Sequence, residues 1–304
     1  MVAVLVKSIP GNRGFIARII SFVNLNQQLQ THLTHIVRER DPYIASGGHF
    51  LVQQYIQQQF LQWGSVEIHT FEVRSKICRN LILNLPCDPK FAKVTLPPIL
   101  IGAHYDAVPG SPGADDNATG VAVLLELARI FASAPTKYPL RLVAFDMEEY
   151  GLLGSASYAA KLKQEQQSLR LMLSLEMLGY RSQEDHSQVY PPPLEKFYPH
   201  KGNFIALIGT WRTLGDLIGV SRGMRKVGIP SQWLPVPNRG LIVRQTRRSD
   251  HAPFWDLGYP AILVTDTADM RNPYYHEPSD TIATLDLDFL TGVCQGLERG
   301  IRNL

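Results

Sequence analysis

The sequence predicts an α/β protein with three αβα layers, in which a mostly parallel, mixed central sheet is covered by helices on both faces. Two observations carry this prediction. Short apolar runs recur along the chain, and they alternate with segments whose apolar residues have helical spacing. The runs are apolar at consecutive positions, which is typical of strands that are buried on both faces of a parallel sheet.

The N-terminal part of the chain has a different pattern. Residues 26–64 carry apolar side chains at helical spacing with a break near Asp41 and Pro42, which predicts two helices. The buried face of the second helix is expected to consist of Tyr55, Ile56, Phe60 and Leu61. Residues 66–85 alternate between apolar and polar side chains, as a pair of antiparallel strands does.

From residue 98 onward, strands and helices are expected to alternate. The expected strands are residues 98–104, 140–145, 169–175, 204–208 and 261–264. The expected helices are residues 118–132, 155–166, 211–218 and 287–302. Residues 181–202 and 230–248 are rich in proline or arginine and are expected to be long loops. No linker separates two complete cores, so we predict one domain over residues 1–304, with a poorly defined segment at 1–25.

Composition narrows the class of protein. The 304 residues are 45% hydrophobic and 19% charged, as in globular proteins. The net charge of +3 is too small for a protein that coats nucleic acid, so no nucleic-acid partner is expected. No run approaches the roughly 20 apolar residues of a transmembrane helix, and no signal peptide is evident, which favours a cytoplasmic protein. The oligomeric state does not follow from the sequence.

Acids and histidines gather where the expected strands end. These are His104 and Asp106 after the first of the later strands, Glu148 and Glu149 after the second, and Glu176 after the third. His276 lies in the loop after the last strand, and Asp116 lies in the loop that follows His104. Because the carboxyl ends of parallel strands line one crevice, we expect these side chains to converge.

Such a cluster needs a cation. Two carboxylates about 4 Å apart repel by about 4 kcal/mol at an effective dielectric constant near 20. The cationic side chains between His104 and Glu149 fall away from the strand ends. Carboxylates and imidazoles together suit zinc, and two histidines with three carboxylates exceed one tetrahedral shell. The residues therefore favour two divalent ions, which a bridging carboxylate holds about 3.5–4 Å apart.

Each of these side chains also has a structural explanation. Asn117 or Thr119 can cap the following helix, and His276 can be a histidine of a surface loop. Glu148 and Glu149 can be a solvated pair. Because these explanations together leave the positions at the strand ends to coincidence, we favour the metal site.

Two other patterns do not support a function. Residues 219–223 match the GxSxG pattern of serine hydrolases, but that pattern requires a preceding strand. A helix, and not a strand, is expected before these residues. We therefore interpret the match as a chance occurrence in a loop. Residues 117–119 match a glycosylation sequon, but a glycan beside Asp116 would block the crevice.

Six motifs contain these residues and follow one another along the chain. They are GAHYD (102–106), GADDNATG (113–120), FDMEEYGLLGS (145–155), SLEMLGY (174–180), SDHAPFWDLGYPA (249–261) and NPYYHEPSDT (272–281). In kind and order they resemble the motifs of the M28 family of zinc peptidases. The resemblance extends from about residue 98 to the C-terminus, and it implies the phosphorylase/hydrolase-like zinc exopeptidase fold with two co-catalytic zinc ions.

The resemblance also implies roles for single residues. The ligands of the two ions would be His104 and Glu176 for the first, Glu149 and His276 for the second, and Asp116 for both. Asp106 would orient the imidazole of His104. Glu148 would be the general base, which takes a proton from water and passes it to the leaving amine. Many family members carry Asp where this chain has Glu176, whose side chain is one methylene longer.

Three further residues lie inside the motifs. Tyr275 is a candidate hydrogen-bond donor to the oxyanion of the reaction, and packing against its neighbours is an equal alternative. Asp250 and His251 belong to a motif that lies near the site in the family. We expect them to support the site from behind rather than to bind metal.

The function that the resemblance implies is hydrolysis of peptide bonds, most simply as an aminopeptidase. The expected substrate is a peptide or small amide whose free amine is attracted by acids such as Glu148 and Glu176. One alternative is a glutaminyl-peptide cyclotransferase of the same fold, which uses one zinc ion. Such cyclases carry a proline-containing run after the bridging acid and a tryptophan beside the final histidine, where this chain has residues 117–120 and Tyr275. Another alternative is a non-catalytic binding domain, which would be expected to lack some ligands.

Overall fold

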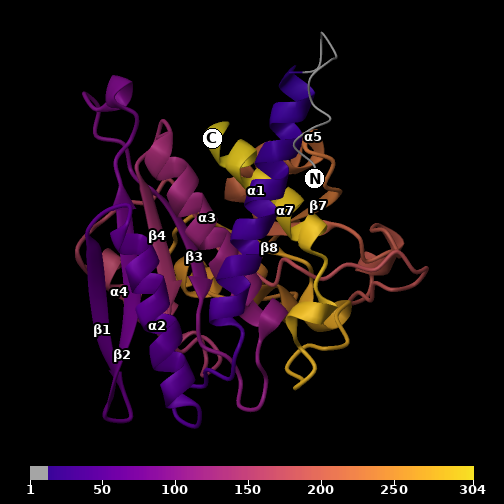
Figure 1. Cartoon of the computed structure of the whole chain (residues 1–304), viewed down its shortest axis with the longest axis horizontal. Coiled ribbons are helices and arrows are strands. Elements are labelled where there is room, and N and C mark those ends of the chain that lie inside the picture. Colours follow the sequence, from indigo (N-terminus) through magenta and orange to yellow (C-terminus); the bar gives the residue numbers. More distant parts are fainter. Residues whose placement is uncertain (1–12) are drawn as a thin grey trace, which may run out of the picture.

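The computed structural model describes residues 13–304, and side chains from residue 22 onward. Its centre is a sheet with the strand order β1–β2–β4–β3–β5–β8–β6–β7 (Figure 1). The strands are β1 (Val66–Val73), β2 (Lys76–Leu85), β3 (Ile99–His104), β4 (Leu140–Phe145), β5 (Leu171–Glu176), β6 (Ile205–Thr210), β7 (Ser231–Val236) and β8 (Ala261–Thr265). Strands β4, β3, β5 and β8 are parallel neighbours, as are β6 and β7, while β1, β2 and β6 join through antiparallel pairs. The predicted mixed, mostly parallel sheet is confirmed.

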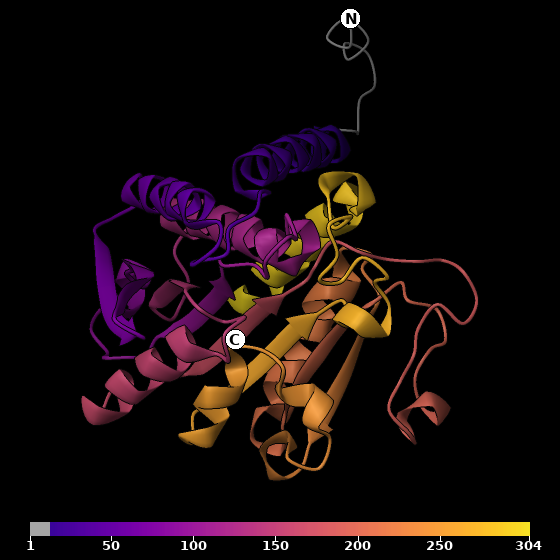
Figure 2. The same cartoon turned by 90° about the horizontal axis from the view of Figure 1, so that it is seen from below.

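Helices cover both faces of the sheet (Figure 2). One layer consists of α1 (Arg13–Ile36), α2 (Ser46–Leu61), α3 (Gly120–Ser133), α5 (Leu214–Lys226) and α7 (Leu287–Arg302). The other layer consists of α4 (Leu153–Gln164) and α6 (His251–Asp256). Each layer packs on its own hydrophobic core, so the central strands are buried from both sides.

Strand β3 shows how the sequence produces this arrangement. Ile99 and Ile101 point into the core beneath α1, α2 and α3, whereas Leu100 points into the core beneath α4 and α6. Because successive side chains of a strand face opposite sides, a strand between two helical layers must be apolar at every position. This requirement explains the continuous apolar runs in the sequence.

Most of the expected elements lie within a few residues of their predicted positions. Strand β4 and helix α7 have the predicted bounds, and β1 and β2 form the predicted antiparallel pair. Residues 181–202 hold only a short 3-10 turn, as expected for a loop. Ile56 and Phe60 are buried in α2, but Leu61 is 55% exposed, because it lies beside the buried stripe of the helix rather than on it.

Two predictions between residues 211 and 248 are wrong. Helix α5 continues to Lys226, so the GxSxG pattern lies inside a helix rather than in a loop, and its Ser221 is buried with its hydroxyl 2.8 Å from that of Ser231. Residues 230–248 are not only a loop, because they begin with the edge strand β7. An edge strand tolerates Pro235, which cannot donate a ladder hydrogen bond.

The N-terminal segment is more ordered than we expected where it is described. Helix α1 begins at Arg13, so residues 13–25 of the predicted ill-defined segment are helical, and residues 1–12 lie outside the described residues.

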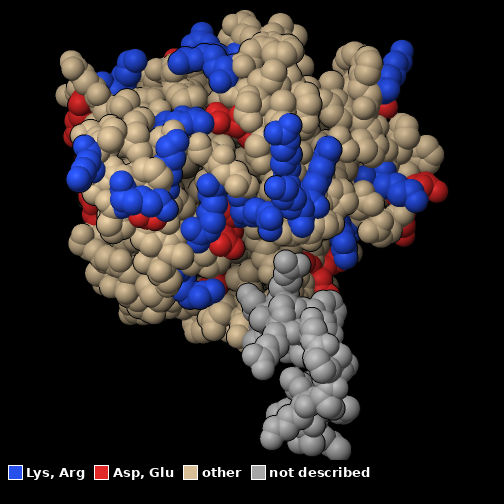
Figure 3. Space-filling model, turned by 90° about the horizontal axis from the view of Figure 1, so that it is seen from above, with Lys and Arg blue, Asp and Glu red and all other residues tan. Residues whose placement is uncertain are grey.

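Within residues 13–304, no helix has both the length and the apolar character needed to cross a bilayer. Many Lys and Arg side chains lie on the face drawn in Figure 3, with a few Asp and Glu side chains between them. The single-domain organisation over residues 1–304 stays a prediction.

Candidate metal centre

The carboxyl ends of the parallel strands bring the predicted residues together. His104 is the last residue of β3 and Glu176 is the last residue of β5. Glu148 and Glu149 follow β4 in a turn, and Asp116 lies in the irregular segment between β3 and α3. His276 enters from the loop after β8, where its backbone is in the left-handed region with φ of 62°.

The first group of side chains surrounds His104. Its Nε2 lies 3.3 Å from Oδ1 of Asp116 and 3.3 Å from Oε1 of Glu176. One ligand atom from each of these residues lies within 4.8 Å of the others. All three side chains are buried, so these polar atoms have little access to water.

The second group lies on the other side of Asp116. Nε2 of His276 is 3.1 Å from Oδ2 of Asp116 and 3.4 Å from Oε2 of Glu149. These three residues again offer ligand atoms within 4.8 Å of one another. Asp116 therefore presents one carboxylate oxygen to each group, which is the arrangement that a bridging ligand needs.

The carboxyl groups of the cluster are buried close together, an arrangement that bound cations would stabilise. Burial raises the pKa of Glu149 to about 7, and the negative charge of Asp116 adds to this effect. Burial also raises the pKa of Glu148 and of Glu176. Carboxyl groups with raised pKa values are held close together without enough positive charge, and bound divalent ions would relieve this.

The pKa values of the two histidines are raised as well, which favours their charged form. Burial opposes the charged form of His276, but the hydrogen bonds that it donates to Asp116 and Glu149 raise its pKa to about 10. Burial likewise opposes the charged form of His104, yet the charges of Glu176 and Glu148 raise its pKa well above the usual value. In the absence of metal, protons on the imidazoles therefore supply the positive charge of the cluster.

The donor set fits zinc. Each group has one imidazole and carboxylate oxygens, which are common zinc ligands. Oε1 of Glu149 is buried and, among the described residues, has no hydrogen-bond partner. A buried carboxylate oxygen without a donor is costly, and coordination of a cation would satisfy it.

Asp106 lies behind the first group. Its Oδ1 is 3.5 Å from Nδ1 of His104, and its two oxygens accept the backbone N–H groups of Glu148 and Glu149 at 3.1 Å each. A single buried carboxylate thus contacts the ligand on β3 and fixes the turn after β4. Such outer contacts orient metal ligands.

Asp250 and His251 have different surroundings. Asp250 is buried, and burial raises its pKa to about 7 while the charge of His104 opposes the rise. His251 donates from Nε2 to the carbonyl of Thr246 at 2.8 Å and packs edge-on against Trp255. Burial lowers the pKa of His251 to about 3, so its ring is neutral. His251 supports the turn before α6 and lies outside both ligand groups.

Three supporting residues were not singled out from the sequence. Ser249 donates its hydroxyl to Oε2 of Glu176 at 2.7 Å. The carboxylate of Asp280 accepts the backbone N–H groups of Asp115 and Asp116 at 2.9 and 3.1 Å. Ser249 and Asp280 both lie inside the motifs given above, so the sequence contained a signal that could have identified them. Arg40 lies far from any motif, and its contacts were not foreseeable.

The sequon residue Asn117 has a structural role. Its side chain is buried, donates to the carbonyl of Leu175 at 2.8 Å and accepts the N–H of Met177 at 3.0 Å. These bonds tie the Asp116 segment to the end of β5. A glycan has no room at this position, in agreement with the expectation from the sequence.

Tyr275 lines the cleft above the cluster. Its ring stacks on that of His276, and its hydroxyl accepts a hydrogen bond from Arg248 at 3.0 Å. Burial and the charge of Asp116 raise the pKa of Tyr275, so its hydroxyl keeps its proton at neutral pH and can donate it. The geometry is compatible with both roles that the sequence left open.

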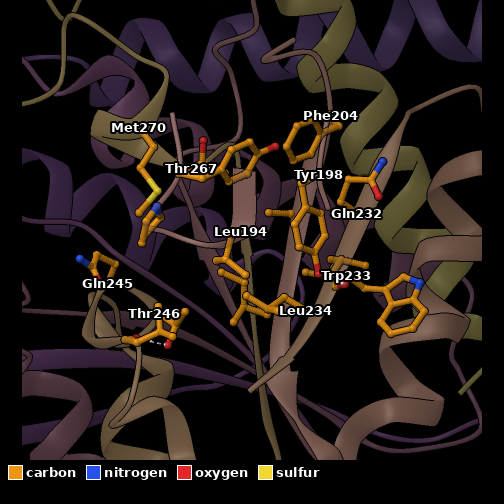
Figure 4. A pocket seen from close by; sticks show the side chains of 16 residues that line it. Leu194, Tyr198, Phe204, Gln232, Trp233, Leu234, Gln245, Thr246, Thr267 and Met270 are labelled. Carbon is orange, nitrogen blue, oxygen red and sulfur yellow. Dashed lines mark hydrogen bonds between the residues drawn. The ribbon is translucent and has the colours of Figure 1, made fainter. Parts of the chain in front are cut away.

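The cleft over the cluster has an empty volume of about 580 Å³ and includes Glu148 and Tyr275 in its wall. A second, apolar pocket of about 520 Å³ adjoins it. The two cavities share the lining residues Ile208, Gln245, Thr267 and Met270. In Figure 4, Leu194 and Tyr198 from the loop 181–202 and Leu234 from β7 surround this second space. An apolar group can therefore occupy the pocket while polar groups remain beside the cluster.

Known proteins share these features. The model of peptidase family M28 matches residues 80–203 and 227–297. The uncharacterized protein YfbL of Escherichia coli K12 is 39% identical over 217 residues, which are 66% of this chain and 65% of that protein. BSAP, a zinc aminopeptidase from Bacillus subtilis, superposes with a TM-score of 0.57 at 25% identity, over 75% of this chain and 50% of that one.

Structural similarity to another solved structure covers more of the chain than the two matches above. The LapA aminopeptidase of Legionella pneumophila superposes with a TM-score of 0.69 at 18% identity and covers 97% of this chain and 76% of that one. This likeness confirms the aminopeptidase-like fold that the motifs implied. The chain spans less than two thirds of the length of YfbL and half that of BSAP.

Proposed function

The chain belongs to peptidase family M28, and on this basis we propose that it is a zinc-dependent aminopeptidase that removes residues from the N-termini of peptides. The observation that carries the proposal is the position of Asp116 between two groups, each with one histidine and one glutamate. His104 and Glu176 would hold one zinc ion and His276 and Glu149 the other, with Asp116 shared.

The protein's own residues account for the proton transfers. Bound zinc supplies Lewis acidity, which makes water a stronger nucleophile near neutral pH and polarises the scissile carbonyl. Glu148 lies within reach of this cluster and is not part of either Asp116-containing group. Because burial raises its pKa well above the usual value, Glu148 can hold the proton taken from water until the leaving amine accepts it.

The surroundings of the cluster favour a free amine on the substrate. Glu148 and Glu176 line the cleft beside the cluster, and an ammonium or amine group is attracted to such carboxylates. The adjoining apolar pocket would accept a large apolar side chain of the substrate. We therefore propose a preference for peptides with an apolar or aromatic residue near the scissile bond.

Hydrolysis of amino-acid chromogenic amides tests the proposal. We expect activity with zinc, loss of activity with a chelator, and a loss of at least about 100-fold in kcat for Glu148→Gln with unchanged zinc content. Glu72→Gln, on the exposed face of β1, is the matched control and should behave as the wild type. Activity that resists the chelator, or a fully active Glu148→Gln variant, would rule out this mechanism.

The cyclotransferase alternative gives a different product. A peptide that begins with glutamine would lose ammonia and keep its length, whereas an aminopeptidase would release free glutamine. The second group, formed by His276, Glu149 and Asp116, supports the two-ion peptidase over an enzyme with one zinc ion. Mass spectrometry of one such peptide separates the two functions.

A further inference from the structure

Arg40 is buried in the segment that joins α1 to α2, outside both ranges that match the family model. It is among the largest fully buried side chains among the described residues. No carboxylate of those residues forms an ion pair with it, although buried arginines usually have such a partner. The side chain of Arg40 is held by hydrogen bonds to uncharged groups instead.

All five N–H donors of the Arg40 guanidinium are used, and every acceptor is a backbone carbonyl. The Nε atom donates to Tyr105 at 2.9 Å, which is the residue that follows His104. The Nη2 atom donates to Gly113 at 2.8 Å and to the carbonyl of Asp116 at 3.1 Å. The Nη1 atom donates to Pro112 and Arg38.

Four of these five acceptors belong to the segments that carry His104 and Asp116, and the fifth, Arg38, lies in the same joining segment as Arg40. The planar fork of one side chain therefore spans from the end of β3 to the segment before α3 and fixes their separation. Gly113 permits the close approach: its φ is +57°, and a Cβ atom there would lie within 2.9 Å of both terminal nitrogens of Arg40.

The neighbouring residue extends this connection to the second group. Oδ2 of Asp41 accepts the hydroxyl of Tyr150 at 2.6 Å, and Tyr150 directly follows Glu149. Oδ1 of Asp41 accepts the N–H groups of Tyr43 and Ile44 at 2.8 and 2.6 Å, which holds the carboxylate in place. The helix-joining segment thus contacts three of the segments that carry metal ligands.

We propose that Arg40 is a positioning residue of the metal centre: it holds the His104 and Asp116 segments at the separation that two zinc ions require. This inference rests on the proposed metal centre. It concerns the geometry of the guanidinium rather than its charge, because a positive charge alone would repel bound cations. Lysine keeps the charge but cannot make the same planar set of five bonds, so it should not replace Arg40.

The test compares the zinc affinities of Arg40→Lys and Arg170→Lys, measured by competition with a chelator. Arg170 is the control: it is partly buried, and its guanidinium fork donates to both carboxylate oxygens of Asp216 in α5 at 3.0 and 2.7 Å, at the end of β5 opposite Glu176. We expect Arg40→Lys to bind zinc about 10- to 100-fold more weakly. Arg170→Lys should lower the melting temperature and leave the zinc affinity unchanged.

A second variant and a second readout exclude a general loss of structure. Arg40→Gln keeps two donors and leaves no charge to bury, and it should show the same loss of affinity with a native circular dichroism spectrum. At saturating zinc, kcat of both variants should return towards that of the wild type, because the defect lies in metal occupancy.

Three results would overturn the proposal: wild-type zinc affinity in both Arg40 variants, equal losses of affinity in Arg40→Lys and Arg170→Lys, or failure of both Arg40 variants to fold while Arg170→Lys folds. A wild-type protein that binds no zinc would instead refute the metal centre itself. The two failures are therefore distinguishable.

Discussion

Oδ2 of Asp116 lies 3.1 Å from Nε2 of His276, and this contact joins the segment after β3 to the loop after β8, the last strand of the sheet along the chain. The other oxygen of the same carboxylate faces the buried imidazole on β3. Substitution of a side chain that contacts both groups should affect the binding of both ions. Glu149 and Ser249 each contact one group only: Glu149 lies beside His276, and Ser249 donates to Glu176.

Asp116→Asn should remove both zinc ions, because an amide offers one carbonyl oxygen and no charge to two cations. Glu149→Gln should weaken only the ion held with His276. Elemental analysis after dialysis measures the difference, with fewer than one ion per chain expected for Asp116→Asn and about one for Glu149→Gln. Asp269→Asn, at the exposed rim of the cleft, is the control and should retain two ions. Two ions in Asp116→Asn would show that this residue is not a shared ligand.

Ser249→Ala should weaken one zinc ion by about 10- to 100-fold, because it removes the hydroxyl that donates to Oε2 of Glu176 at 2.7 Å. Ser221→Ala is matched to it, since Ser221 is also a buried serine that pairs with another serine hydroxyl, but it lies in α5. The control should lose some stability and no zinc affinity. Titration with a fluorescent zinc chelator makes the comparison, and equal affinities in the two variants would contradict the role of Ser249.

Zinc binding should release protons. In the metal-free protein, the pKa of His276 is raised to about 10 and that of Glu149 to about 7, so at neutral pH the imidazole is protonated and the carboxyl is partly so. Ligands must lose these protons to bind metal, so zinc affinity should increase as the pH rises from about 6 to about 9. Calorimetry in buffers of different ionisation enthalpy counts the protons. An affinity that is constant over this range would contradict the assignment of His276 as a ligand.

Met270→Trp should narrow the passage between the cleft and the apolar pocket, because Met270 lines both cavities. We expect kcat/KM for a phenylalanine amide to fall by at least about tenfold, with little change for an alanine amide. Met270→Leu, which roughly conserves volume, is the control. Equal losses for the two substrates would show that the pocket does not receive the substrate side chain.

The fold was predictable where burial dictates the sequence. Strands such as β3 and β4 are apolar at nearly every position because helices cover both of their faces, and this leaves a clear signal. Strand β7 lies at the edge of the sheet and contains Pro235, so its sequence resembles that of a loop. The helix predicted to end at Ile218 continues through Gly219 and Gly223 to Lys226 as α5. Gly223 lies against the backbone of Gly300 in α7, where a side chain would not fit.

The site was predictable to the extent that its residues follow strands. His104 and Glu176 end parallel strands, and topology alone brings them together. Arg40 acts through bonds to backbone carbonyls, which exist only after the chain has folded and which no side-chain pattern records. The hydrogen bond from Ser249 to Glu176 depends in the same way on tertiary contact.

The proposed mechanism requires two zinc ions that share Asp116. Anomalous diffraction at the zinc edge, from crystals grown with zinc, would locate these ions. We expect two peaks flanking this carboxylate, one beside His104 and Glu176 and the other beside His276 and Glu149. A single peak, or peaks that do not contact Asp116, would contradict this mechanism.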